Sequence, residues 1–151
     1  MTGSYSITTV NRSSVAWNRY YWTAPSDIAF TINTQPNDKL LGGNGQEILA
    51  WDQAVKFLGA GGTEGYADGQ VIWQAPNGKC FGIQIHIPVQ LFGMGTSPYY
   101  QVKTVQDGGW DGEHRSDPYN FSKDIGFDIT VKAVADHASM HVTATINDLA
   151  S

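Results

Sequence analysis

The clearest pattern along the chain is an alternation of apolar and polar residues in short segments that are bounded by glycine, proline and asparagine. In residues 81–87, FGIQIHI, Phe81, Ile83 and Ile85 alternate with smaller or polar neighbours. A period of two is the signature of a strand with one buried face. Apolar residues at helical spacing nowhere persist beyond two or three turns. The pattern therefore predicts an all-β protein.

Eight segments show the alternation or the β-rich composition expected of strands: 4–10, 28–34, 46–50, 70–75, 80–87, 100–105, 127–134 and 140–147. Turn residues lie at 36–38, 42–45, 59–62 and 75–78. Asn77-Gly78 predicts a type I′ hairpin, and the last two segments predict a closing hairpin. Many short strands with frequent turns favour a compact β-sandwich with at most one or two short helices.

Residues 48–59, ILAWDQAVKFLG, are the one plausible helix. Ile48, Trp51, Val55 and Leu58 recur at spacings of three to four, and the glycine at the end is a typical helix cap. A strand is the alternative for this segment.

Composition limits the classes of function. The 151 residues suit one domain, 1–151, and the formal charge of −5 gives no basic footprint for nucleic acid or anionic lipid. Cys80 has no partner for an internal disulfide, and its place on a predicted strand indicates burial. No signal peptide or apolar span of about 18 residues is visible. We expect a soluble protein, stored in the cytoplasm or released, that acts at target-cell membranes.

The densest polar cluster is DGGWDGEHRSDPYN, residues 107–120. Its spacing does not match a calcium loop, and one glycine-rich loop does not fix the two carboxylates of a glycosidase. It is either a solvated loop or a recognition loop with Trp110 and Tyr119 as platforms. The histidines form no zinc motif, and no nucleophile motif is present. We therefore expect no enzyme activity, no cofactor and no metal.

Aromatic residues give the stronger signal. VAWNRYYWTAP, residues 15–25, holds four aromatic side chains within six positions, and the segment after Pro88 is rich in apolar and aromatic residues although it contains glycines and a second proline. Tyrosine and tryptophan combine an apolar body with a polar tip, which suits either a bilayer interface or the face of a sugar.

The order of these motifs resembles a known family. The run VNRSSVAWNRYYWTAPSDIAF followed by DKLLGGNGQ, then GGTEG at 61–65 and the Gly109-Trp110 step, is similar to the sea-anemone actinoporins. The N-terminal SYSIT and the length of the last hairpin are similar to the mushroom fruit-body lectins, which share the actinoporin fold. The resemblance spans most of the chain and implies a single actinoporin-like β-sandwich domain.

The resemblance also implies site residues. Actinoporins dock on membranes through an aromatic-rich loop and a phosphocholine pocket, and the mushroom lectins bind glycans. By position, the implied ligand-binding residues, to which the two platforms of the polar loop are added, are Thr23, His86, Pro88, Tyr99, Tyr100, Trp110 and Tyr119. The implied membrane-facing residues are Trp22, Leu91, Phe92 and Met94.

Two departures from the actinoporin pattern shape the functional hypothesis. Only a few residues precede the first predicted strand, so the amphipathic helix that lines the actinoporin pore is missing, and the tyrosine-rich stretch that completes the phosphocholine pocket has no counterpart. We expect a non-enzymatic recognition protein that binds a lipid headgroup, such as phosphocholine or sphingomyelin, or a glycan on target-cell membranes. The alternatives are a pore-forming cytolysin that oligomerises on membranes and a structural homo-oligomer.

Overall fold

A computed structural model of the chain describes residues 3–25, 30–53, 68–87, 98–104, 108–116, 118–121, 125–135 and 139–149. These residues form β1 (Gly3–Asn11), β2 (Trp17–Thr23), β3 (Phe30–Thr34), β4 (Lys39–Leu40), β5 (Gly45–Gln53), β6 (Gly69–Gln74), β7 (Cys80–His86), β8 (Tyr99–Lys103), β9 (Tyr119–Phe121), β10 (Phe127–Ala135) and β11 (Met140–Asp148). The prediction of an all-β sandwich is confirmed.

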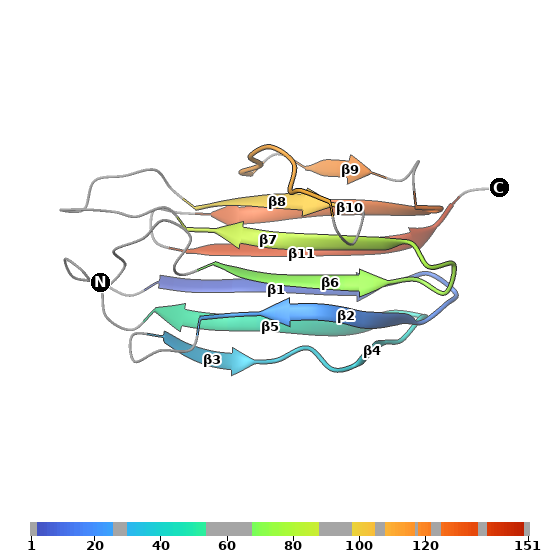
Figure 1. Cartoon of the computed structure of the whole chain (residues 1–151), viewed down its shortest axis with the longest axis horizontal. Coiled ribbons are helices and arrows are strands. Elements are labelled where there is room, and N and C mark those ends of the chain that lie inside the picture. The colour runs from blue at the N-terminus through green and yellow to red at the C-terminus, as the bar shows by residue number, and fades with distance from the viewer. Residues whose placement is uncertain are drawn as a thin grey trace.

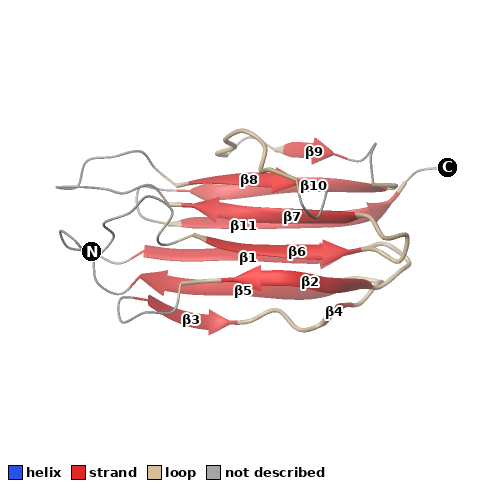
Figure 2. Cartoon of the chain, viewed as in Figure 1, coloured by secondary structure: helices blue, strands red, loops and turns tan. Residues whose placement is uncertain are grey.

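The strands form two facing sheets (Figures 1 and 2). The six-stranded sheet has the order β3-β5-β1-β11-β10-β9, and the five-stranded sheet, in front in Figure 1, has the order β4-β2-β6-β7-β8. β1 pairs in parallel with β11, whereas the other pairs are antiparallel. No described segment is a helix long and apolar enough to cross a bilayer.

The core lies between the two sheets and is filled by alternate residues of each strand. Ile83 and Ile85 of β7 point inward as predicted and are fully buried. Three tryptophans, Trp17, Trp51 and Trp73, have almost no exposed surface and supply much of the core volume. Cys80 is buried, as expected from its place on a strand. Residues at alternate strand positions thus form the core, and most of the residues between them lie on the outer faces of the sandwich.

Of the two interpretations of residues 48–59, the helix is wrong and the strand is correct for residues 48–53, which belong to β5; residues 54–59 lie outside the described residues. β5 pairs with β1 on one side and β3 on the other, so its backbone hydrogen bonds are made across the sheet. Leu49 and Trp51 point into the core with the alternation of a strand. Sheet pairing on both sides has overridden the helical spacing.

The predicted hairpin turn at Asn77-Gly78 forms, but its type I′ geometry is wrong. Gly78 has a φ of 84°, whereas Asn77 is not among the residues with positive φ, which type I′ requires at both positions. Pro76 explains the difference, because it has no N–H to close a two-residue loop. Ala75 closes the ladder instead, donating to the Lys79 carbonyl at 2.8 Å. The connection is therefore a three-residue loop with glycine in the left-handed position.

The two sheets approach closely at Gly69 of β6, and this contact gives a first prediction. A Cβ atom there would lie 2.4 Å from Cη2 of the buried Trp51, so Gly69→Ala is expected to lower the free energy of unfolding by about 2 kcal/mol. Gly109→Ala is the matched control, because its Cβ meets no described atom within 4 Å. Chemical denaturation of both variants checks this, and equal stabilities would contradict it.

Candidate functional site

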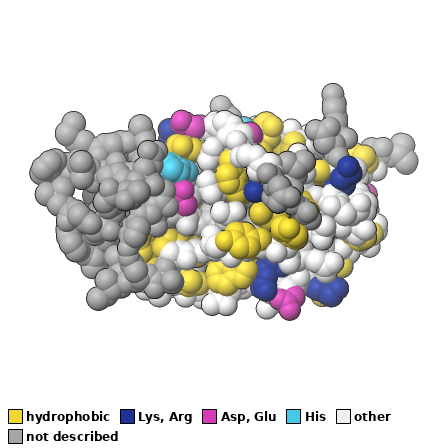
Figure 3. All heavy atoms as spheres, viewed as in Figure 1, with side chains coloured by type: hydrophobic (Ala, Val, Ile, Leu, Met, Phe, Trp, Pro, Cys, Tyr) yellow, Lys and Arg dark blue, Asp and Glu magenta, His cyan; other side chains and the backbone are white. Residues whose placement is uncertain are grey.

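The outer side of the five-stranded sheet carries aligned rows of side chains, because paired residues on neighbouring strands point to the same side. One row is Thr23, Gln70, Gln84 and Gln101, named here the glutamine row. The next row is Tyr21, Ile72, Gly82 and Lys103, with Trp110 lying over Gly82, named the aromatic row. Hydrophobic side chains gather over β2 and β6 on this face (Figure 3).

A third group lies at the end of β7 and β8 and consists of Asp68, His86, Tyr99 and Arg115, named here the end cluster. His86 Nδ1 lies 2.8 Å from Asp68 Oδ2, and the other oxygen of Asp68 accepts a hydrogen bond from the Ile87 amide at 2.7 Å. Both side chains are largely shielded, with 13% and 17% of their surfaces exposed. Asp68 therefore fixes both the imidazole and the end of β7.

Rings and cations complete the end cluster. The ring of His86 lies 4.9 Å from that of Tyr99, and the Arg115 guanidinium lies 5.4 Å from the Tyr99 ring centre. Arg115 also donates to the Pro98 carbonyl at 3.2 Å and pairs with Glu113 at 3.0 Å. The end cluster thus offers a ring platform flanked by hydrogen-bonding groups.

The glutamine row is a continuous chain of hydrogen bonds. Gln70 donates to Gln84 at 3.4 Å, Gln84 donates to Gln101 at 3.2 Å, and Gln101 donates to the Asp111 carbonyl at 2.7 Å. Because the last acceptor is a backbone carbonyl, it sets the direction of the whole chain. Three amide groups are thereby held in one orientation across three strands.

The aromatic row depends on the missing side chain of Gly82. A Cβ atom at Gly82 would lie 2.9 Å from Ile72 Cγ1 and 3.2 Å from Trp110 Cη2, so the glycine lets the indole approach the sheet. Ile72 is 3% exposed although it lies on the outer side. The Lys103 ammonium lies 4.6 Å from the centre of the Trp110 ring. Tyr21 remains 48% exposed.

Tyr20 and Tyr21 are both exposed because β2 is irregular. The pairing of β2 with β6 shifts register between Arg19 and Tyr21, so that two successive tyrosines reach solvent. Of the aromatic residues in 15–25, Tyr20 and Tyr21 therefore reach solvent, whereas Trp17 is in the core.

The polar segment 108–116 is fastened along β8 by paired contacts. Tyr100 and His114 exchange two backbone hydrogen bonds of 2.9 Å, and Asp111 accepts from the Val102 amide at 2.8 Å. Asp111 also lies 2.7 Å from His114 Nε2. Within the described residues, hydrogen bonds to β8 hold this segment in place and position Trp110 on the outer face of the five-stranded sheet.

The structure brings some of the expected site residues together and separates others. Thr23, His86, Tyr99 and Trp110 share the outer face, while Trp22 is half-buried and packs against the core. Tyr100 is completely buried and stacks on His114, so it offers no surface to a ligand. Tyr119 is half-buried, with its ring 4.2 Å from that of His114. Residues outside the described ranges are Pro88, Leu91, Phe92 and Met94.

Sequence reasoning missed other residues of this face: Asp68, Gln70, Gln84, Gln101 and Arg115. Gln70, Gln84 and Gln101 could have been found from the sequence, because a glutamine recurs on the polar side of consecutive predicted strands. Asp68 and Arg115 had no such signal, because their contacts join segments that are distant along the chain. Among the described residues, no three metal-ligating side chains come together.

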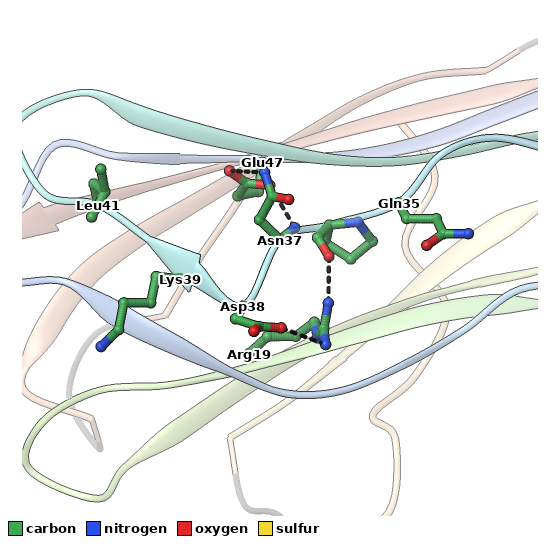
Figure 4. A pocket seen from close by; sticks show the side chains of 8 residues that line it. Arg19, Gln35, Asn37, Asp38, Lys39, Leu41 and Glu47 are labelled. Carbon is green, nitrogen blue, oxygen red and sulfur yellow. Dashed lines mark hydrogen bonds and ion pairs between the residues drawn. The ribbon is translucent and has the colours of Figure 1, made fainter.

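A separate cavity with a volume of ≈ 660 Å³ opens at the edge of the sandwich beside β4 (Figure 4). Arg19 of β2 pairs there with Asp38 at 2.7 Å and donates to the Pro36 carbonyl. Asn37 donates twice to Glu47 of β5, at 2.7 and 3.2 Å. These bonds connect residues 36–38 to β2 of one sheet and β5 of the other. The polar groups that line the cavity therefore stabilise the edge of the sandwich.

Comparison with solved structures identifies the fold. A lipid-binding protein, Nakanori, superposes with a TM-score of 0.59 at 11% identity, over 95% of this chain and 70% of the other. A mutated lectin of Xerocomus chrysenteron, XCL, gives a TM-score of 0.55 at 14% identity, over 97% and 98% of the two chains. Neither a protein-family model nor a curated protein matches the sequence.

The chain therefore has the actinoporin-like β-sandwich fold, as the sequence resemblance implied. Its five-stranded sheet presents an outer face on which amide, aromatic and imidazole groups are held in fixed rows.

Proposed function

We propose that this protein is a non-enzymatic recognition protein that binds a glycan or a membrane lipid headgroup at cell surfaces through the outer face of its five-stranded sheet. The observation that carries the proposal is the grouping on that face of the end cluster, the glutamine row and the aromatic row. Fixed hydrogen-bonding groups beside apolar rings are typical of sites that bind small polar ligands with apolar faces.

The similar structures support the same class of function. Nakanori is described as a lipid-binding protein and XCL as a lectin, so proteins of this fold include binders of both kinds. The end cluster also includes His86 and Tyr99, which the actinoporin resemblance implies to be ligand-binding residues. Two alternatives, a pore-forming protein and a structural homo-oligomer, are distinguished by separate measurements. Dye release from sphingomyelin vesicles tests for a pore, and sedimentation velocity tests for an oligomer.

The proposed function is tested by truncating the platform of the end cluster. Tyr99→Ala is expected to weaken binding about fivefold, because it removes the ring that contacts both His86 and Arg115. Wild type and variant are compared on a glycan array and on vesicles with and without sphingomyelin. Val134→Ala, a 75% exposed position on the six-stranded sheet, is the control. Absence of binding to every glycan and vesicle would refute the proposal.

A further inference from the structure

We propose that the glutamine row and the aromatic row together bind one linear, uncharged oligosaccharide that lies across strands β2, β6, β7 and β8. This inference rests on the proposed function, since it assigns a ligand class and an orientation to the same face. It goes further by placing the main contacts in the middle of the sheet, away from the end cluster.

The hydrogen-bonding pattern of the glutamine row suits hydroxyl groups. A side-chain amide has two N–H donors and one oxygen with two lone pairs. Gln84 uses one N–H toward Gln101 and one lone pair toward Gln70, which leaves capacity of both kinds for a ligand. A sugar hydroxyl donates and accepts at the same atom, so a row of such amides can engage successive hydroxyls.

The rows also select against charged ligands. Thr23, Gln70, Gln84 and Gln101 carry no charge, and the cation of the neighbouring aromatic row is Lys103. Its ammonium lies 4.6 Å from the Trp110 ring centre and 3.4 Å from the Gly108 carbonyl. Recognition of a phosphate or carboxylate usually employs a guanidinium or ammonium aimed at the ligand. The occupant that fits these rows is uncharged.

The aromatic row supplies the apolar half of the contact. A sugar ring has C–H groups on its faces and hydroxyls around its edge, so it is best bound by an apolar surface that adjoins a hydrogen-bonding one. Tyr21 and Trp110 supply such a strip one row away from the glutamines, with the buried Ile72 beneath and between them. Tyr21 is 48% exposed and offers the most accessible ring of the strip.

The length of the rows indicates a chain of sugars. Neighbouring strands lie about 4.8 Å apart, so a row that crosses four strands spans about 14 Å, which is longer than one sugar ring. Because the amides are already bonded to one another, a ligand loses little affinity to their ordering. A short linear oligosaccharide can therefore contact each strand in turn.

The experiment begins with an array that carries neutral and acidic glycans, followed by calorimetry with oligomers of one to six units of the best-bound neutral glycan. Affinity is expected to rise with length until about three or four units and then to level off. Gln84→Leu and Tyr21→Ala are each expected to lower the affinity for the tetramer about tenfold. Thr143→Ala, exposed on the six-stranded sheet, is the matched control.

Each outcome supports or overturns the proposal. Tyr21 is largely exposed, so its variant keeps the test valid even if Gln84→Leu reduces stability. If Tyr99→Ala weakens neutral-glycan binding while the Gln84 and Tyr21 variants bind like wild type, the oligosaccharide proposal is overturned and the proposed function stands. Binding only to acidic glycans or to sphingomyelin vesicles also overturns the oligosaccharide proposal and leaves the proposed function standing. Binding to nothing overturns both proposals.

Discussion

Replacing Asn11 by alanine is expected to lower the free energy of unfolding by about 3–4 kcal/mol. The side chain of Asn11 is completely buried, and its amide donates to the carbonyls of Val15 and Leu40 at 2.7 and 3.1 Å. Its oxygen accepts from the amide and the hydroxyl of Ser13 at 3.0 and 2.6 Å. After truncation the Ser13 hydroxyl and the Val15 carbonyl keep their mutual hydrogen bond of 3.1 Å, whereas the Leu40 carbonyl and the Ser13 amide lose the bonds that Asn11 made to them. Each unsatisfied buried group costs about 1–3 kcal/mol.

Equilibrium denaturation measures this effect, and Ser14→Ala is the control. Ser14 is exposed and its hydroxyl makes only a long bond of 3.4 Å to Asp148, so its removal is expected to change stability by less than about 0.5 kcal/mol. A loss below about 1 kcal/mol for the Asn11 variant would show that the network around it contributes little.

Asp68→Ala is expected to lower the free energy of unfolding by about 2–3 kcal/mol and to weaken ligand binding at the end cluster by up to about fivefold, as for Tyr99→Ala. The carboxylate accepts from the Ile87 amide at 2.7 Å and lies 2.8 Å from His86 Nδ1. Its loss removes the hydrogen bond that orients the imidazole beside Tyr99 and the carboxylate that accepts from the Ile87 amide just after β7.

Calorimetry with the best-bound glycan or lipid vesicle, together with denaturation, measures both effects. Asp68→Asn separates them, since an amide oxygen still accepts from the Ile87 amide while the charge toward His86 is lost. Asp128→Ala is the control, because its carboxylate lies on the outer side of the six-stranded sheet and accepts from Asn120 at 2.6 Å. Unchanged affinity in a folded Asp68→Ala variant would exclude the end cluster from binding.

Much of the fold could be predicted because several strands alternate between apolar and polar residues. The alternation is clearest in β10 and β11 and in the second half of β7, and the predicted bounds of β6, β7, β10 and β11 lie close to the observed ones. Strand β2 is not predicted by the pattern, because its bulge places Tyr20 and Tyr21 on the same exposed side and so breaks the alternation. Strands β4 and β9 are too short to show any period.

The candidate site was less predictable, because its contacts join distant segments. The resemblance could align His86 and Tyr99 with site residues of the family. The contacts of His86 with Asp68 and of Tyr99 with Arg115 depend on how β6, β8 and segment 108–116 pack together, which the sequence pattern does not show. One of the motifs in the resemblance, Asn11 and Ser13 before Trp17, consists of completely buried residues, and Asn11 and Ser13 are hydrogen-bonded to each other. In this fold, shared sequence motifs are therefore stronger evidence of a shared core structure than of a shared ligand.

The parallel pair of β1 and β11 has a consequence for how the protein is made. Ser4 and Ser139 are 135 residues apart and yet hydrogen-bonded, so the six-stranded sheet stays incomplete until nearly the whole stretch between them has left the ribosome. Until then the edge of β1 that pairs with β11 lacks its partner, although the other edge is covered by β5, and an unpaired strand edge favours aggregation of nascent chains. A fold closed by contacts of such long range is also expected to form slowly. Synthesis at high rates should therefore depend on chaperones that shield the early strands.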